Sequence, residues 1–291
     1  MLTPLVGKQD AYPTCRQAGC LPHLSKRTHD LAHWNPSGKL AVVTGASSGI
    51  GRCLAKRLTA AGCRVIAVAR RADRLQSLSE EIHREGDDDL LLPIRGDVTD
   101  SATHDQIESL IRSRDGSLDL LVNNAGIGAI GSFEDATESR LRKIMEVNFF
   151  APAQLTRRLL PYLKSSDDAV ICNLGSVLGH RAVPDKSEYC ASKFAMHGWS
   201  DALRAELAGT SVRVTLVSPS TTESEFFDVL VDSDANATSK SFGSWPADRV
   251  AAATLTAIGK RRSEVILSLG GKLLVYADRL CPPLMNWALR K

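Results

Sequence analysis

Residues 39 to 51 read Lys39-Leu-Ala-Val-Val-Thr44-Gly45-Ala-Ser-Ser-Gly49-Ile-Gly51, and they carry the strongest indication of the fold. Its apolar first half predicts a short buried strand, and the pattern that continues through Leu54, Ala55 and Leu58 predicts a helix after the glycines. Glycines in such a turn let the backbone approach a pyrophosphate, whose charge the N-terminus of the helix stabilises. An ordinary turn is the alternative for the glycines alone, but their position between a strand and a helix indicates a dinucleotide site.

Outward from this stretch, apolar strands alternate with helical patterns over most of the chain. The predicted strands are Leu40–Thr44, Arg64–Ala69, Leu90–Arg95, Leu120–Val122, Ala169–Asn173 and Val212–Val217. The predicted helices begin at Gly49 or cover Asp73–Arg84, Ser101–Arg112, Glu138–Leu163 and a segment from about Tyr189 to Ala208. Such alternation is typical of an α/β fold, a Rossmann-like doubly wound parallel sheet in a single domain, which binds ligands at the carboxyl ends of its strands.

Tyr189 and Lys193 are four residues apart on one of these predicted helices, so their side chains lie next to each other. A free tyrosine has a pKa of roughly 10, and a nearby cation favours the phenolate. We therefore expect Lys193 to lower the pKa of Tyr189 toward neutrality and to make it a useful proton donor. The spacing alone is more often a solvated helix face, and the other motifs decide between the two readings.

Four motifs, taken together and in order, resemble those of the short-chain dehydrogenase/reductase family. They are Thr44-Gly45-Ala46-Ser47-Ser48-Gly49-Ile50-Gly51, Asn123-Asn124-Ala125-Gly126, Ser176 and Tyr189-x-x-x-Lys193, with Ser176 thirteen residues before Tyr189. The resemblance runs from about Lys39 to about Pro219. It implies the catalytic residues Asn148, Ser176, Tyr189 and Lys193, and a cofactor site of Gly45, Ser47, Ser48, Gly49, Ile50, Gly51, Asp97, Val98, Asn124, Ala125, Gly126, Tyr189, Lys193 and Pro219.

By the same resemblance, Ser176 would hydrogen-bond the substrate oxygen, and Tyr189 would give or take its proton. Lys193 would assist Tyr189 and bind the nicotinamide ribose, while Asn148 would hold a water that links Lys193 to solvent. Asn148 has a structural alternative, since a buried helix asparagine often bonds a backbone carbonyl. Asp97 has one too, as a helix cap before Ser101.

The choice of cofactor depends on the end of the second strand. An NAD-selective enzyme commonly has an acidic residue there, whereas this chain has Ala69 followed by Arg70 and Arg71. Guanidinium groups bind phosphate oxygens, so Arg70 and Arg71 favour NADP(H), with NAD(H) as the alternative. The two arginines could also be an exposed helix start.

Composition excludes several other classes of protein. The chain has 291 residues, a formal net charge of +3 without a dense basic block, and a hydrophobic fraction of 43%, so nucleic-acid binding has little support. Seven cysteines, mostly within predicted strands and helices, favour reduced thiols and a cytoplasmic location, and no signal peptide or membrane-spanning stretch is predicted. No metal site is predicted, because the spacing of Cys15, Cys20, His23, His29 and His33 matches no paired zinc pattern.

Both ends of the chain differ from the central domain of residues 39–269. Residues 1–38 are punctuated by prolines and predict a poorly ordered extension. Residues 270–291 form an apolar, amphipathic tail that Pro282-Pro283 should divide into two helices. We expect Leu273, Leu274, Tyr276, Leu280, Leu284 and Trp287 to be buried in an oligomer or against the cleft, with membrane-surface contact as the alternative.

Two segments are expected to decide substrate specificity: Val177–Ser187 and Ser220–Trp245. The second contains residues that suggest an apolar lid, namely Phe226, Phe227, Val229, Leu230, Phe242 and Trp245. Ser220 also departs from the family, which usually has glycine after the proline that follows the sixth strand.

The sequence therefore predicts an NADP(H)-dependent oxidoreductase that acts on an apolar alcohol or carbonyl compound and forms a homo-oligomer. The alternatives are an NAD(H) enzyme of the same chemistry and a non-catalytic, cofactor-binding regulatory protein. The four intact catalytic positions argue against the second alternative.

Overall fold

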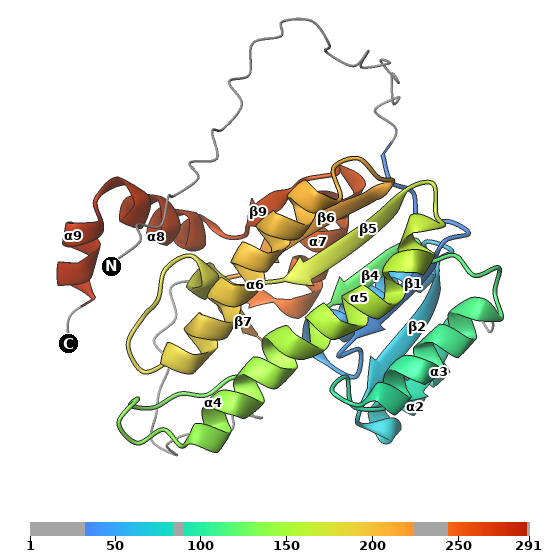
Figure 1. Cartoon of the computed structure of the whole chain (residues 1–291), viewed down its shortest axis with the longest axis horizontal. Coiled ribbons are helices and arrows are strands. Elements are labelled where there is room, and N and C mark those ends of the chain that lie inside the picture. The colour runs from blue at the N-terminus through green and yellow to red at the C-terminus, as the bar shows by residue number, and fades with distance from the viewer. Residues whose placement is uncertain (1–32, 84–89, 224–243, 290–291) are drawn as a thin grey trace, which may run out of the picture. The chain divides into compact units, whose positions relative to one another are not determined.

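A computed structural model describes residues 33–83, 90–223 and 244–289, which belong to one compact unit. Seven parallel strands form its central sheet in the order β3-β2-β1-β4-β5-β6-β9. Figure 1 shows this sheet and the helices around it. The predicted Rossmann-like α/β fold is confirmed.

The strands are β1 (Leu40–Thr44), β2 (Arg64–Ala69), β3 (Leu91–Arg95), β4 (Leu120–Asn123), β5 (Ala169–Leu174), β6 (Val212–Ser218), β7 (Thr222–Glu223), β8 (Trp245–Pro246) and β9 (Glu264–Ile266). The helices are α1 (Gly49–Ala60), α2 (Ala72–His83), α3 (Ser101–Arg112), α4 (Glu138–Met145), the π-helix η1 (Glu146–Phe150), α5 (Ala151–Lys164), the short 3₁₀-helix η2 (Val177–Gly179), α6 (Ser187–Glu206), α7 (Ala247–Gly259), α8 (Leu269–Leu280) and α9 (Pro282–Ala288).

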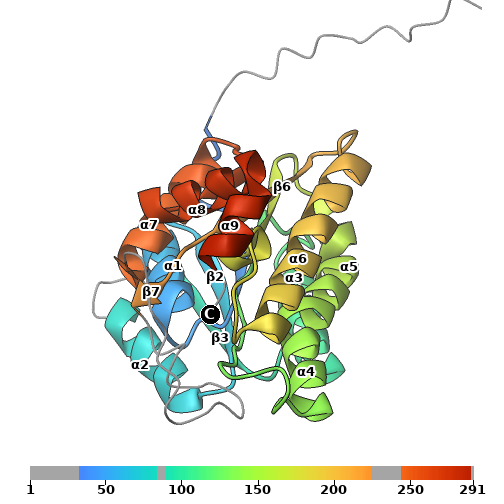
Figure 2. The ribbon, with the colours of Figure 1, turned by 90° about the vertical axis from the view of Figure 1, so that its left-hand side faces the viewer.

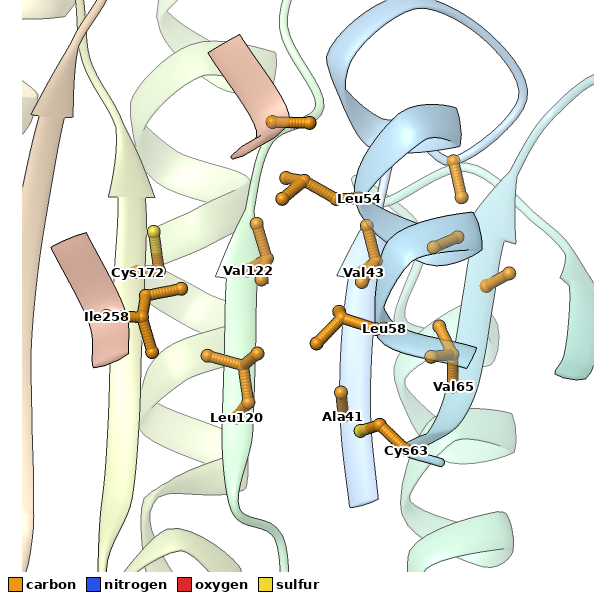
Figure 3. Close-up of a cluster of buried hydrophobic side chains, with 14 of the residues drawn as sticks. Ala41, Val43, Leu54, Leu58, Cys63, Val65, Leu120, Val122, Cys172 and Ile258 are labelled. Carbon is orange, nitrogen blue, oxygen red and sulfur yellow. The ribbon is translucent and has the colours of Figure 1, made fainter. Parts of the chain in front are cut away.

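Helices cover both faces of the sheet, which explains why its strands are apolar without alternation. Ala41 and Val43 of β1 pack with α1, α2 and α7, whereas Leu40 and Val42 pack with α3, α5 and α6. Figure 2 separates the two helix layers, and Figure 3 shows the first cluster, in which Leu54 and Leu58 of α1 lie over the strands. Successive residues of a strand point to opposite faces, so each strand supplies both layers of the core.

The strand order reverses between β1 and β4, which lie side by side although β2 and β3 come between them in sequence. In a doubly wound sheet, a crevice opens at this reversal, beyond the carboxyl ends of the strands. The turn after β1 and the loop after β4 meet there. The fold thus brings the glycine motif and the Asn123–Gly126 motif to one place.

The domain begins earlier than the predicted boundary at Lys39. Trp34 is 4% exposed and belongs to the core, its Nε1 donates a hydrogen bond to Asp168 O, and its backbone N donates to Gly259 O. An aromatic ring packed in this way cannot belong to a loose extension, so residues 33–38 belong to the domain. Residues 1–32 lie outside the described residues.

The tail is divided at the predicted position, since α8 ends at Leu280 and α9 begins at Pro282. The expected burial of its apolar side chains is not observed within this chain. Leu273, Tyr276, Leu280, Leu284 and Trp287 are all more than half exposed, and Leu274 is partly buried against η2. Among the helices described here, none has the length and apolar character that would let it cross a bilayer.

Candidate active site

A cavity of about 1250 Å³ lies at the carboxyl end of the sheet and is lined by most of the predicted site residues. It takes in the glycine turn, the arginines after β2, the loops after β3 and β4, Ser176, Tyr189 and Lys193. Pro219 also lines it. Its size exceeds that of most small-molecule sites and suits an extended cofactor together with a substrate.

The glycine turn is held by close packing against the loop after β4. A β-carbon on Gly51 would lie 2.3 Å from Gly45 O and 2.5 Å from Asn124 Nδ2, so only glycine fits. Asn124 Nδ2 donates a hydrogen bond to Thr44 O over 2.8 Å, and Thr44 Oγ1 accepts bonds from the backbone N of Asn124 and of Ala125. Asn124 and Thr44 therefore fix the shape of the turn.

The N-terminus of α1 opens into the cavity at this turn. Its N-cap residue, Ser48, makes no side-chain capping bond, and the first turn of the helix has no acidic residue. Free N–H groups and the positive end of the helix dipole are thus available to an anion. The donor set fits the pyrophosphate of a dinucleotide.

Arg71 lies beside the same turn, where its Nη2 donates to Ser48 Oγ over 2.6 Å and to Ser47 Oγ over 3.3 Å. Arg70 is more exposed, and its Nη1 lies 3.7 Å from Asp97 Oδ2. Asp97 Oδ1 accepts bonds from Thr99 N and Thr99 Oγ1, so Asp97 also shapes the loop before α3. The region between β2 and the glycine turn is therefore rich in cationic and hydroxyl donors.

Ser176, Tyr189 and Lys193 meet at the other end of the cavity. A hydrogen bond joins the side chains of Ser176 and Tyr189, and Lys193 Nζ lies 5.7 Å from the centre of the Tyr189 ring. Lys193 is 6% exposed, and its Nζ donates to Leu174 O over 2.8 Å. The structure brings together the three side chains that the sequence selected for proton transfer.

The predicted effect of Lys193 on Tyr189 is wrong in this structure, because burial dominates the titration of both groups. Burial raises the pKa of Tyr189 to about 12, although the Ser176 hydrogen bond acts in the opposite direction. Burial also lowers the pKa of Lys193 to about 8. At neutral pH the phenol is protonated, as a free tyrosine is, and its raised pKa makes it a weaker acid than the sequence predicted.

Asn148 lies in the π-helix η1, a local widening that is common at functional sites. Its Oδ1 accepts a hydrogen bond from Ile127 N, and its Nδ2 donates to Ile127 O and Ser192 Oγ. These contacts match the structural alternative for Asn148, since the side chain ties the loop after β4 to α6. The predicted link through water stays a prediction.

Sequence reasoning missed a buried ion pair at the start of α6. Arg140 Nη2 lies 2.6 Å from Glu188 Oε1, and both side chains are almost fully buried. Glu188 precedes Tyr189, so the pair anchors the turn of helix that carries the phenol. An arginine and a glutamate 48 positions apart give no sequence pattern that could have identified it.

The two predicted specificity segments differ in outcome. Val177, Leu178, Val183, Pro184 and other residues up to Lys186 line the cavity, as expected. Trp245 instead packs against the core, with Arg249 stacked on its ring at 3.9 Å, so it is not part of a lid. The other lid residues (Phe226, Phe227, Val229, Leu230, Phe242) lie outside the described residues.

The tail forms part of the cavity wall. The sequence had left three positions open for it: an oligomer interface, the cleft and a membrane surface. Leu274 and Ala277 of α8 and Met285 and Ala288 of α9 line the cavity. Ser268 caps α8 and its Oγ donates to Ser220 Oγ over 2.9 Å, which links the tail to the loop after β6. Ser220, the departure from the family pattern, thus has a structural partner in the tail.

Known proteins are similar to this chain in sequence and in fold. The family model described as short chain dehydrogenase matches residues 39–234. A dehydrogenase/reductase SDR family protein 7-like protein of Anopheles gambiae is 32% identical over 285 residues, which cover 92% of this chain and 86% of that protein.

Solved structures agree with the sequence matches. A short-chain dehydrogenase from Streptomyces avermitilis is 30% identical, with a TM-score of 0.72 over 87% of this chain and 96% of that one. A short-chain dehydrogenase from Burkholderia cenocepacia in complex with NADP is 28% identical, with a TM-score of 0.71 over 82% of this chain and 100% of that one.

Proposed function

The chain belongs to the short-chain dehydrogenase/reductase family, and from this premise we propose that it is an NADPH-dependent reductase of apolar ketones or aldehydes. The observation that carries the proposal is the meeting of Tyr189, Ser176 and Lys193 in one large cavity. A tyrosine is protonated at neutral pH and can give its proton to an oxygen on which negative charge develops. Carbonyl reduction requires a donor, whereas alcohol oxidation requires a base.

In this proposal, the nicotinamide cofactor supplies the hydride that reaches the carbonyl carbon. Ser176 and Tyr189 hydrogen-bond the carbonyl oxygen, and Tyr189 donates its proton as charge develops there. Lys193 carries a positive charge at neutral pH and stabilises the phenolate that remains. Asn148 holds the loop after β4 against α6 and so positions Lys193. Lys193 Nζ is close to this loop, since a β-carbon at Gly126 would lie 3.9 Å from it.

The preference for NADPH is supported by the donors around Arg71. Arg71, Ser47 and Ser48 are already joined by hydrogen bonds, and none of them is acidic. A 2′-phosphate would find charge-assisted donors there. Neighbours of this fold have been solved with NADP, from Burkholderia cenocepacia, and with NAD, from Burkholderia phymatum, so the fold alone does not choose the cofactor. NAD(H) with the same chemistry is the alternative.

The apolar substrate is supported by the lining of the cavity beyond Tyr189. Ile127, Ile130, Val177, Leu178 and Leu274 contribute apolar side chains there. We also infer a cytoplasmic homo-oligomer: the five described cysteines are free thiols, and the tail presents an exposed apolar surface that a second copy could cover.

The test is turnover of a panel of apolar ketones and aldehydes with NADPH and with NADH. Tyr189→Phe should lower kcat at least about 100-fold, because it removes the proton donor, while NADPH affinity stays within a few-fold. Tyr162→Phe is the matched control, since the Tyr162 hydroxyl donates to Glu108 on α3 and does not line the cavity. Wild-type turnover by Tyr189→Phe would refute the role of Tyr189, and no turnover by any carbonyl substrate would favour the regulatory protein.

A further inference from the structure

Two histidines and a glutamate form a cluster behind the active site, among residues that play no part in the proposed reaction. His180 follows η2, His197 lies on α6 one turn after Lys193, and Glu264 begins the edge strand β9. One ligand atom from each lies within 4.8 Å of the others. Among the described residues that line the cavity, none of the three occurs.

The distances suit a small tetrahedral ion. His180 Nε2 lies 3.4 Å from Glu264 Oε1, and His197 Nε2 lies 3.8 Å from the same oxygen. Zinc binds nitrogen and oxygen at about 2.0–2.2 Å, which separates the ligand atoms of a tetrahedral site by roughly 3.3 Å. All three ligand atoms lie within 4.8 Å of one another, so side-chain movements of up to about 1.5 Å would bring them around one ion.

The polar atoms of the cluster are poorly satisfied by the protein itself. Within the described part of the chain, Glu264 Oε1 is buried without a hydrogen-bond partner, and so is His180 Nδ1, the ring nitrogen on the side away from the proposed ligand atom Nε2. The His180 side chain is only 1% exposed. A buried carboxylate oxygen that accepts no hydrogen bond is costly, and a bound cation removes that cost.

The charges around the cluster are of both signs. Arg279 of α8 acts electrostatically on His180 and weakens the attraction for a cation. The carboxylates of Glu264 and Asp201 act in the opposite direction, and Asp201 Oδ2 lies 3.4 Å from His197 Nε2.

We propose that His180, His197 and Glu264 bind a divalent transition-metal ion of the zinc class, with water in the fourth position. Two imidazoles and a carboxylate are a donor set that zinc uses in proteins. The ion would have a structural role, since it would tie the loop that carries Ser176 to α6 and to β9. Gly179 already packs so closely on α6 that a β-carbon there would lie 2.6 Å from Lys193 O.

One contact competes with the metal and provides a sharp variant. His180 Nε2 lies 2.9 Å from Ser218 Oγ, so the serine hydroxyl can donate to the lone pair that the metal needs. Ser218→Ala removes this hydrogen bond. In the variant, metal binding no longer breaks a hydrogen bond between His180 and Ser218. We therefore expect the variant to bind the metal several-fold more tightly than the wild type.

The experiment titrates Co²⁺ and Zn²⁺ into the full chain after treatment with a chelator. We expect one tightly bound Co²⁺ per chain, with the visible absorption of a nitrogen and oxygen site and no thiolate charge-transfer band. Zn²⁺ should raise the melting temperature. His197→Gln and Glu264→Gln should each weaken binding at least about 10-fold and abolish the rise in melting temperature.

His83→Gln is the matched control, since His83 is exposed at the end of α2. It should bind the metal as the wild type does. A thiolate band would assign the ion to cysteines instead, and equal affinity in the wild type, His197→Gln and Glu264→Gln would refute the site. Absence of stoichiometric binding to the wild type would also overturn the proposal. Each outcome is independent of turnover, so this test and that of the proposed reductase can fail separately.

Discussion

At the scale of single residues, Lys193 holds an ammonium group in the interior of the protein. Its Nζ donates a hydrogen bond to Leu174 O and lies near the Tyr189 ring, and burial lowers its pKa to about 8 from a value of 10.5. A buried cation costs stability unless it is well paired. Residues held at such a cost are typical of active sites, where function outweighs stability.

This cost makes stability depend on pH in a defined direction. The pKa of Lys193 is lower in the folded state, so its destabilising effect is complete below about pH 8 and disappears as the pH rises toward 10.5. Lys193→Met should raise the free energy of unfolding at pH 7 by on the order of 3 kcal/mol. Urea unfolding at pH 7 and pH 10 measures the gain over the wild type, which should shrink at the higher pH. An equal gain at both pH values would contradict the assigned titration.

Arg70 and Arg71 are adjacent in sequence but differ in their surroundings. Arg71 bonds both serines of the glycine turn, whereas Arg70 is 55% exposed and only loosely paired with Asp97. Arg71→Ala should weaken NADPH binding more than NADH binding by about 1–3 kcal/mol, the value of a lost charge-assisted hydrogen bond. Arg70→Ala is the matched comparison and should have a smaller effect.

Calorimetric titration of the two cofactors into both variants gives the four affinities. If Arg71→Ala lowers the affinities for NADPH and NADH equally, Arg71 does not bind the 2′-phosphate. If Arg70→Ala has the larger selective effect, the roles of the two arginines are reversed. The sequence alone named both residues and could not rank them, because their neighbours come from the turn after β1.

At the scale of elements, local patterns predicted most strands and helices within a few residues. The prediction omitted α7, although Val250, Ala251, Thr254, Ala257 and Ile258 follow a helical pattern. Two further exceptions depend on contacts that are distant in sequence. The helix expected over Glu138–Leu163 widens into η1, where Asn148 bonds Ile127 from another loop. β9 pairs with β6 over only three residues, so its strand conformation depends on that neighbour more than on its own short sequence. No period in the sequence encodes such contacts.

The segment before β1 shows the same limit. Its prolines suggested a loose extension, but Trp34 reaches both the end of α7 and the start of β5. Trp34→Ala should lower the free energy of unfolding by about 3–5 kcal/mol through loss of packing in the core. Phe133→Ala is the control, because the Phe133 ring is 68% exposed, and it should change stability by less than about 0.5 kcal/mol. Similar losses in both variants, measured by urea unfolding, would contradict the assignment of Trp34 to the core.

At the scale of the whole molecule, the motifs were a reliable guide to the cavity because a doubly wound sheet gathers its loops at one edge. The titration of the site was not predictable in the same way, since it depends on burial rather than on spacing. The same holds for the tail. The sequence showed that the tail is apolar. It did not show that one side of the tail lines the cavity while the other side is exposed.

The two sides of the tail can be separated by substitution. Leu280 and Trp287 are 87% and 70% exposed, and neither lines the cavity, unlike Leu274 and Met285. Exposed apolar side chains in such a patch indicate a surface that another molecule covers. We predict that the wild type self-associates through this patch and that Leu280→Glu with Trp287→Glu makes it monomeric, with KM unchanged. Sedimentation velocity and steady-state kinetics of the two proteins provide the measurement.

Phe133→Glu is the control for charge and exposure, since Phe133 is 68% exposed on another loop, and it should leave both the mass and KM unchanged. The patch could be covered by a second copy of the chain or by a membrane surface, and the two alternatives predict different measurements. Self-association depends on protein concentration and not on lipid, whereas an interfacial helix binds vesicles as a monomer. If the wild type and the double variant sediment alike, but only the wild type co-floats with vesicles, the patch is a membrane anchor and the prediction of a protein interface is wrong.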